Sequence, residues 1–409
     1  MINKSDRQED IITILKNMDI SPTMFKNAMV KYNALSSYLE DYGIIAKIYP
    51  QGSFAIGTVI RPNNYGRDAY YDLDIICQII GKKSEYSPSS LREKVKIALV
   101  SNELYKDKLS ILNECFSIEY AEINNSGFII DIVPAIDESE DIKNRLIQGS
   151  ENSQLINTSI ALPKQISKEE YEWITNNPLG FKKWFDEINQ QYLESIIYEQ
   201  KERLFIENRN LYLSVDDVPE YLVKTPLQRV IQIFKYHRDI YYLQIKNGNE
   251  IKPISAILNV IVTDIAKYYN KNCTVFELLE HILSELDIYS NYLFTSDVEF
   301  RRKFDNRSVI SKSSGKWLVK NPANPEDNLA DKWNENEDIP NRFFKWIKVL
   351  REDLINSLDS DDEFFYSVLE NSFGKNSTSH FAQKYNSKNM VEPEKIKVEA
   401  KPYSYYDIK

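Results

Sequence analysis

The sequence has few of the residue patterns that mark disulfide, zinc and membrane proteins. Its three cysteines form no C-x-x-C pair, and its three histidines form no zinc motif. No apolar run approaches the roughly eighteen residues of a membrane-spanning helix, and the N-terminus lacks a signal-peptide core. We therefore expect a soluble, cytoplasmic protein with free thiols, two of them buried in apolar runs at Cys77 and Cys115. The remaining residues of this group are Cys273, His237, His281 and His380.

A dominant positive charge is also missing. The formal net charge of −10 at pH 7 argues against a general nucleic-acid binder, which would carry a large basic face. It leaves room for a local basic groove that holds a triphosphate. A chain of 409 residues with 42% hydrophobic content can bury a large core, usually in two lobes, and we see no internal repeat.

What the chain does contain is a Gln51-Gly52-Ser53 turn between two predicted elements. Residues 44–49 are typical of a strand, and a helix is predicted to begin near Phe54. Such a turn places backbone N–H groups and a serine hydroxyl where phosphate oxygens can bind. The alternative is that Gly-Ser forms only a turn.

About twenty residues later, Asp72-Leu73-Asp74 lies in residues 71–77, which are rich in β-branched residues and predict a strand. Side chains alternate along a strand, so Asp72 and Asp74 point to the same face. Two carboxylates about 7 Å apart on one face are costly unless a cation lies between them. The alternative is a solvated strand face without function.

A third carboxylate, Asp131, is flanked by apolar residues. Residues 114–120 and 127–133 predict two strands joined by a turn at Asn124–Gly127. Asp131 is an unusual residue in such an apolar strand, unless backbone N–H groups cap it. If this hairpin lies beside the strand of Asp72, three carboxylates converge. That cluster would suit two Mg²⁺ ions, which prefer oxygen ligands and triphosphate partners.

Other segments predict the surrounding scaffold. Ser21-Pro22 starts a helix that ends at Gly43 and braces the back of the sheet. Ser5–Gln8 resembles a capping box that opens a shorter helix before it. Residues 155–162 predict a strand ended by Pro163, and from about residue 165 the chain is predicted to be helical.

Two polar residues stand out in the helical part. Thr225-Pro226 is a strong helix start, and Lys235 falls next to the apolar face of that helix. A later helix that starts near residue 252 has Ser255 in its first turn, where a hydroxyl and free N–H groups form a second phosphate site. The alternatives are a surface lysine that extends to solvent and a serine that only caps its helix.

Together, Gln51-Gly52-Ser53, Asp72-Leu73-Asp74 and Asp131 resemble the DNA polymerase β-like nucleotidyltransferase superfamily. Three further segments make the chain similar to the bacterial CD-NTases, the oligonucleotide cyclases of CBASS anti-phage defence. These segments are PLQRV…KYHRD at 226–239, KPIS at 252–255 and NPANP at 321–325. The family is related to cyclic GMP–AMP synthase and the 2′-5′-oligoadenylate synthases. The resemblance covers about residues 20–370.

The resemblance implies an α+β fold, in which a polymerase β-like nucleotidyltransferase core with a mixed sheet packs against a C-terminal helical lobe. The expected division is a core with its brace helix at 1–165, a helical lobe that completes the nucleotide cleft at 166–375, and a flexible tail at 376–409. The tail is expected because its residues are polar and weakly periodic.

The resemblance also implies the roles of the candidate site residues. Triphosphate-binding residues would come from both lobes: Gln51, Gly52, Ser53, Lys235 and Ser255. The catalytic metal ligands, for two Mg²⁺ ions or Mn²⁺ in their place, would be Asp72, Asp74 and Asp131.

The implied function is joining NTPs into a cyclic di- or trinucleotide second messenger for anti-phage defence. Implied partners are the NTP substrates, CBASS regulatory proteins and an effector that reads the product. Neither double-stranded DNA nor a membrane is expected as a partner, since the chain has no zinc cluster and no apolar span. Two alternatives stay open: a template-independent transferase acting on an RNA end or a small molecule, and a catalytically silent nucleotide-binding protein.

Overall fold

A computed structural model describes residues 2–60, 63–64, 67–68, 70–120, 127–168, 170–194, 196–304 and 308–385 of the chain. In this part of the chain, no helix is both long enough and apolar enough to cross a membrane. The expected turn at Asn124–Gly127 lies almost wholly outside the described residues.

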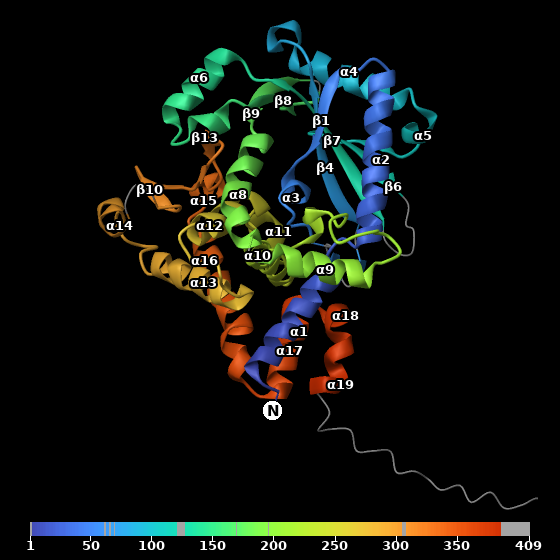
Figure 1. The fold of residues 1–409 in the computed structure, drawn as a ribbon. Helices are drawn as coiled ribbons and strands as arrows, with labels where there is room; N and C mark the ends of the chain where they lie inside the picture. The colour runs from blue at the N-terminus through green and yellow to red at the C-terminus, as the bar shows by residue number, and fades with distance from the viewer. Residues whose placement is uncertain are drawn as a thin grey trace, which may run out of the picture.

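A seven-stranded mixed sheet forms the upper part of the molecule (Figure 1). Its order is β1-β4-β7-β6-β5, with β8 paired to β7 and β9 paired to β8. Only β4 and β7 pair in parallel, while the other neighbours are antiparallel. The strands are β1 Ala46–Pro50, β4 Tyr71–Ile79, β5 Leu109–Ile111, β6 Phe116–Tyr120, β7 Phe128–Asp137, β8 Ile160–Gln165 and β9 Tyr171–Asn176. Short two-stranded sheets pair β2 Asn63–Asn64 with β3 Arg67–Asp68, β10 Ser311–Ser313 with β11 Lys316–Leu318, and β12 Lys320–Asn321 with β13 Asn324–Asn328.

One face of the sheet is covered by helices. Alternate apolar residues of β4, among them Leu73 and Ile75, share a buried cluster with α2 (Pro22–Asp41) and α4 (Pro88–Val100). The cap at Ser21 and the proline after it begin α2, as predicted, and Gly43 follows its end with a positive φ of 95°. The prediction of a brace helix behind the sheet is therefore confirmed (Figure 1).

The rest of the molecule is mainly helical and is built around α10 (Pro226–Leu243). Thr225 caps α10 through a capping box with Gln228, and most residues of α10 are buried. The larger helices around it are α8 Pro178–Leu193, α9 Ile197–Glu207, α12 Ser255–Ala266, α13 Val275–Ser290, α16 Asp338–Leu354 and α17 Asp362–Phe373. The smaller helices are α3 Gly52–Ala55, α5 Glu103–Lys106, α6 Glu140–Gly149, α7 Ser153–Ile156, α11 Gly248–Ile251, α14 Asp297–Lys303, α15 Asp331–Glu335, α18 Lys375–Thr378 and α19 Ala382–Tyr385, with 3-10 turns at Lys83–Glu85, Glu220–Leu222, Asn356–Asp359 and Ser379–Phe381.

The first helix, α1 (Lys4–Asn17), packs in this helical core and not on the sheet. Arg7, 1% exposed, donates to the carbonyls of Ser357, Leu358 and Ser360 and pairs with Asp362 at 2.7 Å. One turn later the carboxylate of Asp10 accepts hydrogen bonds from Lys384 and Tyr385. α1 thus lies beside α17 and the last described helices, α18 and α19 (Figure 1).

Several local predictions were wrong. Residues 155–162 contain the end of α7 and the start of β8, and Pro163 lies inside β8. β8 pairs with β7 only at Ile160 and Ala161, so the proline faces an unpaired edge, where its missing N–H costs little. β9 follows before the chain becomes helical.

Four further details differ from the predictions. The N-cap of α1 is Asn3 instead of Ser5, and α3 begins at Gly52 instead of near Phe54. Cys77 is buried as expected, whereas Cys115 precedes β6 and is only half-buried. The predicted tail begins with ordered residues, because α18 and α19 continue to the buried Tyr385. The exact domain boundaries remain predictions.

We expect Arg7→Met to lower the free energy of unfolding by about 2–4 kcal/mol, because a buried cation and its hydrogen bonds are lost. Lys4→Met is the matched control: Lys4 pairs with Asp359 on the surface at 3.4 Å, a kind of ion pair worth about 1 kcal/mol or less. Denaturant titration of both variants measures the difference. Equal stability of the two variants would contradict the structural role of Arg7.

The decrease in the free energy of unfolding caused by Arg7→Met should depend on pH. The hydrogen bond from Arg7 lowers the pKa of Asp362 below its usual 3.8. A lowered carboxyl pKa stabilises the fold above the unfolded value and loses that effect as the pH falls through the folded value. The difference between Arg7→Met and the parent should therefore shrink on acidification below about pH 4.

Candidate active site

The three predicted carboxylates lie on one face of two neighbouring strands. β4 and β7 run in parallel with Asp74 directly opposite Asp131, and Asp72 is two residues before Asp74. Residues that are paired across strands point to the same side, as do residues two apart. The structure therefore brings Asp72, Asp74 and Asp131 together on the face that α2 and α4 leave uncovered. Their role as metal ligands remains a prediction.

This arrangement disfavours the charged forms of the carboxylates. Burial, followed by the charges of Asp131 and Asp72, raises the pKa of Asp74 to about 7, and only Lys235 opposes the shift. Partial removal from water and the charge of Asp131 also raise the pKa of Asp72. Oδ1 of Asp131 is buried and has no hydrogen-bond partner, so the alternative of full capping by backbone N–H groups fails for this oxygen.

These carboxylates suit a hard divalent cation. As they stand, no three His, Cys, Asp or Glu side chains in the described ranges form a group that could hold a metal ion. Side-chain rotation and phosphate oxygens of a substrate would have to complete the coordination. An oxygen donor set, one buried oxygen without a partner and mutual repulsion are nevertheless the features that a bound Mg²⁺ would satisfy.

The Gln51–Ser53 turn lies against the same carboxylates. The backbone N–H of Gln51 donates to the carbonyl of Asp74 at 2.8 Å. Gly52 has a φ of 60°, and a Cβ at this position would come within 2.8 Å of Oδ2 of Asp74. Glycine is thus required both by the backbone conformation and by the carboxylate beside it. The half-buried Ser53 follows at the start of α3, next to the acidic face.

One face of α10 holds the segment that follows Ser53. Gln228 Nε2 donates to the carbonyl of Ile56, Gln232 Nε2 to that of Val59, and Lys235 Nζ to that of Thr58, each at 2.9 Å. The N–H of Thr58 in turn donates to the carbonyl of Ser53. Sequence reasoning missed Gln228 and Gln232. Gln228, Gln232 and Lys235 are separated by four and then three residues, so they lie on one face of the helix. This spacing is the signal that could have revealed the two glutamines.

Lys235 is a buried cation and not a surface lysine. Its side chain is 4% exposed. Burial, and then the charge of Arg238, lowers its pKa to about 7, while Asp239 and Asp74 oppose the shift. Because Lys235 and Asp74 influence each other, the ammonium group lies within electrostatic range of the carboxylate cluster.

Ser255 is the first residue of α12 and follows the N-cap residue Ile254. Its hydroxyl accepts a hydrogen bond from Arg238 at 3.1 Å, and Arg238 also donates to the carbonyl of Pro253. Arg238 therefore links Ser255 to the helix that carries Lys235.

Comparisons with known proteins support the resemblance to the CD-NTases that the sequence predicts. No protein-family model matches the chain. A curated protein of Roseivirga ehrenbergii named c-di-GMP synthase is 26% identical over 353 residues, which are 85% of this chain and 78% of that protein. The CD-NTase CdnG of Bradyrhizobium diazoefficiens, solved with GTP, has a TM-score of 0.63 at 20% identity and covers 93% of this chain and 99% of its own.

CdnC of E. coli MS115-1, solved with ATP, has a TM-score of 0.50 at 16% identity and covers 90% of this chain and 97% of its own. The chain therefore resembles a c-di-GMP synthase in sequence and the CD-NTases CdnG and CdnC in fold. The predicted resemblance and the α+β fold class are confirmed.

We expect Asp74→Asn to stabilise the metal-free protein at neutral and alkaline pH. Between the usual pKa of 3.8 and about 7, folded Asp74 keeps a proton that the unfolded chain has lost. Stability therefore falls as the pH rises through this window, and asparagine removes the loss. A pKa difference of about three units corresponds to about 4 kcal/mol. Because Asp74 is partly exposed, we expect asparagine to raise the free energy of unfolding by only about 1–2 kcal/mol.

Thermal unfolding in EDTA at about pH 4 and about pH 8 measures this effect, and the gain should appear only at the higher pH. Asp137→Asn is the control, since Asp137 lies on β7 but is exposed and paired with Lys143. A variant that is less stable than the parent at pH 8 would show that Asp74 is not a repelled carboxylate.

Proposed function

We propose that this chain, which has the CD-NTase fold, is a metal-dependent nucleotidyltransferase that joins NTPs into a cyclic di- or trinucleotide. The observation that carries the proposal is the convergence of Asp72, Asp74 and Asp131 beside the Gly52-Ser53 turn. The name of the c-di-GMP synthase relative and the GTP and ATP bound to CdnG and CdnC support this choice of substrate and product. A second-messenger role in anti-phage defence follows from the resemblance.

Asp72, Asp74 and Asp131 would hold divalent ions, two Mg²⁺ or Mn²⁺ in their place. When bound, such ions neutralise polyphosphate charge and lower the pKa of a nearby hydroxyl. This would also relieve the repulsion that raises the pKa of Asp74. Asp131, whose Oδ1 is buried without a hydrogen-bond partner among the described residues, would accept the proton of the attacking ribose hydroxyl.

Ser53 and Lys235 would bind the donor triphosphate from opposite sides. Lys235 donates to the carbonyl of Thr58, and the N–H of Thr58 donates to the carbonyl of Ser53. These hydrogen bonds fix the positions of the two residues relative to each other. A polyphosphate next to Lys235 would favour its charged form and restore a pKa that burial has lowered to about 7. Gln51 and Gly52 shape the turn, and Ser255 would contact the phosphates from the start of α12.

In each turnover the ribose oxygen of one nucleotide bonds to the α-phosphorus of the next, and the bond to the leaving pyrophosphate breaks. The same transfer within the linear product closes the ring. This second step distinguishes a cyclase from a transferase that extends an RNA end or modifies a small molecule. CBASS regulatory proteins and an effector are the further partners that this proposal implies.

We expect Asp72→Asn to reduce product formation at least about 100-fold, the scale seen when a single group that stabilises transition-state charge is removed. Asp72 is exposed on its strand and asparagine is nearly isosteric, so the fold should persist. Mass spectrometry of phosphatase-treated products from all four NTPs with Mg²⁺ or Mn²⁺ measures the outcome. Asp137→Asn, on the same sheet but outside the carboxylate cluster, should retain full activity.

Three results would contradict the proposal. Parental activity of Asp72→Asn would mean that the site is misassigned. Products that remain phosphatase-sensitive would favour a linear transferase. Bound NTPs that never turn over with either metal would favour a silent nucleotide-binding protein.

We expect Lys235→Met to raise KM for NTPs by about tenfold or more, because a charge-assisted hydrogen bond contributes about 1.5–3 kcal/mol. Methionine fills the buried volume of the lysine stem without its charge. Initial rates against NTP concentration measure the effect, with Lys246→Met as a control on an exposed lysine just after α10. An unchanged KM in Lys235→Met would exclude Lys235 from triphosphate binding.

A further inference from the structure

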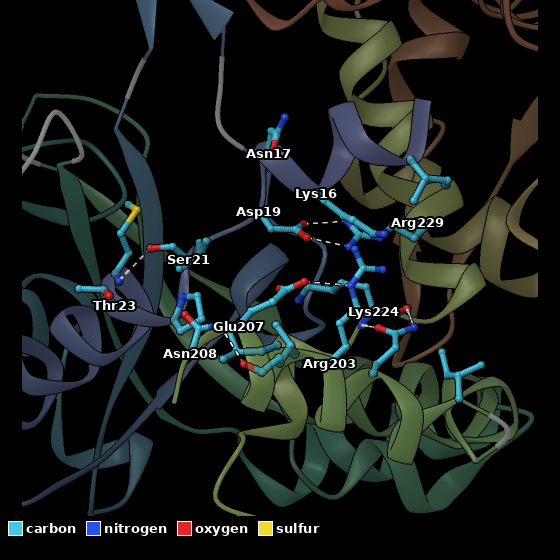
Figure 2. A pocket seen from close by; sticks show the side chains of 18 of the residues that line it. Lys16, Asn17, Asp19, Ser21, Thr23, Arg203, Glu207, Asn208, Lys224 and Arg229 are labelled. Atoms are coloured by element: carbon cyan, nitrogen blue, oxygen red, sulfur yellow. Dashed lines mark hydrogen bonds and ion pairs between the residues drawn. The ribbon is translucent and has the colours of Figure 1, made fainter. Parts of the chain in front are cut away.

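The attacking hydroxyl of the proposed reaction belongs to an acceptor nucleotide, which must reach Asp131. Tyr71 and Phe128, paired across β4 and β7, point to the face of the sheet opposite the three aspartates. There Tyr71 donates to the backbone carbonyl of Asp19, and Asp19 pairs with Arg229 at the wall of a separate cavity of about 1620 Å³ (Figure 2). None of the three aspartates is among the described residues that line this cavity. The acceptor must therefore approach from the face that carries the aspartates, which we call the carboxylate face.

The turn that would bind the donor triphosphate lies on one side of the aspartates. In the strand order β1-β4-β7-β6-β5, the Gln51–Ser53 turn follows β1 and lies beside β4. Gln51 donates to the carbonyl of Asp74, and a Cβ on Gly52 would come within 2.8 Å of the carboxylate of Asp74. Asp131 is on β7, the next strand beyond β4. With the donor on the β1 side, the acceptor lies on the other side of Asp131, over β6.

β6 presents two polar side chains to this region. Ser117 is directly opposite Asp131 in the antiparallel pairing of β6 with β7, and Glu119 is two residues further along β6. Residues in these positions point to the same face as Asp131, with Cβ atoms about 4.5–5.5 Å away for the opposite residue and roughly 7–8 Å away for the diagonal one. Ser117 is half-buried and Glu119 is exposed. Both side chains can therefore contact a molecule that lies against Asp131.

The thiol of Cys115 supports this orientation of β6. Cys115 is two residues before Ser117 and directly precedes β6. Burial, and then the charges of Asp131 and Asp74, raise its pKa to about 12. The two carboxylates act on the thiol only if it lies near them, so alternate residues on this side of β6 face the carboxylate cluster.

An apolar side chain lies between the polar ones. Ile129 of β7 is paired with Asp72 on one side and with Glu119 on the other, so all three point to the carboxylate face. Ile129 is only half-buried. The flat face of a base can cover it, and this contact is favourable because apolar surface is removed from water. A base that packs on Ile129 has its edge within reach of the carboxylate of Glu119.

A carboxylate distinguishes the four bases by the hydrogen-bond donors on their edges. An ionised carboxylate only accepts, and its two oxygens can accept two parallel hydrogen bonds. Guanine has adjacent N1–H and N2–H donors on one edge. On the corresponding edges of adenine, cytosine and uracil, each N–H donor is next to a ring nitrogen or a carbonyl oxygen that would repel the carboxylate. A glutamate at this position therefore favours guanine.

We propose that β6 forms the acceptor side of the nucleotide site, where Ser117 contacts the acceptor ribose and Glu119 selects a guanine base. This inference rests on the proposed nucleotidyltransferase function and adds to it the residue that chooses the acceptor. In the step concerned, the acceptor ribose oxygen bonds to the α-phosphorus of the donor, pyrophosphate leaves and Asp131 takes the proton.

Nucleotides that can act only as acceptors test this assignment. In an α,β-methylene NTP the bond to the leaving group is not cleaved, so the analogue supplies a hydroxyl but cannot be a donor. Each of the four analogues is paired with the ordinary NTP that the full chain consumes fastest with Mg²⁺, and mass spectrometry measures the linear product. The guanine analogue should react about tenfold or more faster than the other three, because only guanine makes the charge-assisted bidentate contact.

Glu119→Gln should lower this preference for guanine about tenfold or more, because the amide replaces one acceptor oxygen by a donor. A ratio of rates is not altered by a general effect of the lost charge on metal or polyphosphate binding. Ser117→Ala should raise KM for all four analogues by a similar factor and leave the preference unchanged. Glu172→Gln is the matched control, since Glu172 is an exposed glutamate on β9 of the same sheet, and it should behave as the parent.

A parent without a preference for guanine, or a preference that survives in Glu119→Gln, would overturn the assignment. An equal loss of rate with all four analogues in Glu119→Gln would also overturn it, because Glu119 would then not read the base. A preference that changes in Ser117→Ala would overturn the role of Ser117.

The product of a mixture of all four ordinary NTPs is a second measurement, which decides if no analogue reacts. Guanine should be present in the parental product, and its share should fall in Glu119→Gln. A product without guanine, or an unchanged share, overturns the assignment while the proposed function stands. If the mixture gives no product at all, the proposed function itself fails.

Discussion

The pairing of β4 and β7 is the constraint on which the site depends, because it holds three mutually repelling carboxylates on one face of the sheet. Asp74 and Asp131 are opposite each other because β4 and β7 run in the same direction in this register. A shift of either strand by one residue would turn its aspartates into the apolar cluster beneath α2 and α4. Burial of the apolar residues against α2 and α4 thus determines that the three aspartates lie on the opposite face of the sheet. The unfavourable charge arrangement is maintained by packing elsewhere in the core.

α10 is the element that relates the sheet to the helical part. It buries Gln228, Gln232 and Lys235, and each of these side chains donates to a backbone carbonyl of residues 56–59. These directional hydrogen bonds specify one arrangement of two elements that apolar packing alone would constrain less. Near its start the same helix presents Arg229 to Asp19, which follows α1.

Local signals in the sequence predicted much of this structure. Ser21-Pro22 and Thr225-Pro226 identified helix starts, and the alternation around Asp72 identified a strand, since each depends on neighbouring residues alone. The nearness of Asp131 to Asp74 was only a conditional expectation, because parallel pairing joins segments more than fifty residues apart. Gln228 and Gln232 were missed because the sequence alone does not show which groups a glutamine side chain on a helix contacts. Pro163 was misread because its tolerance depends on where β7 stops pairing.

The docking of α1 has a consequence for how the chain is made. Arg7 and Asp10 contact residues 350 to 375 positions later in the sequence. Ribosomes add about 5–20 residues per second, so the apolar face of α1 waits roughly 20–70 s for its binding site to be synthesised. During that interval Ile11, Ile14 and Leu15, which are fully buried in the finished molecule, face solvent. Newly made α1 is therefore a segment that chaperones would have to shield, and closure of the helical part must be among the last events of folding.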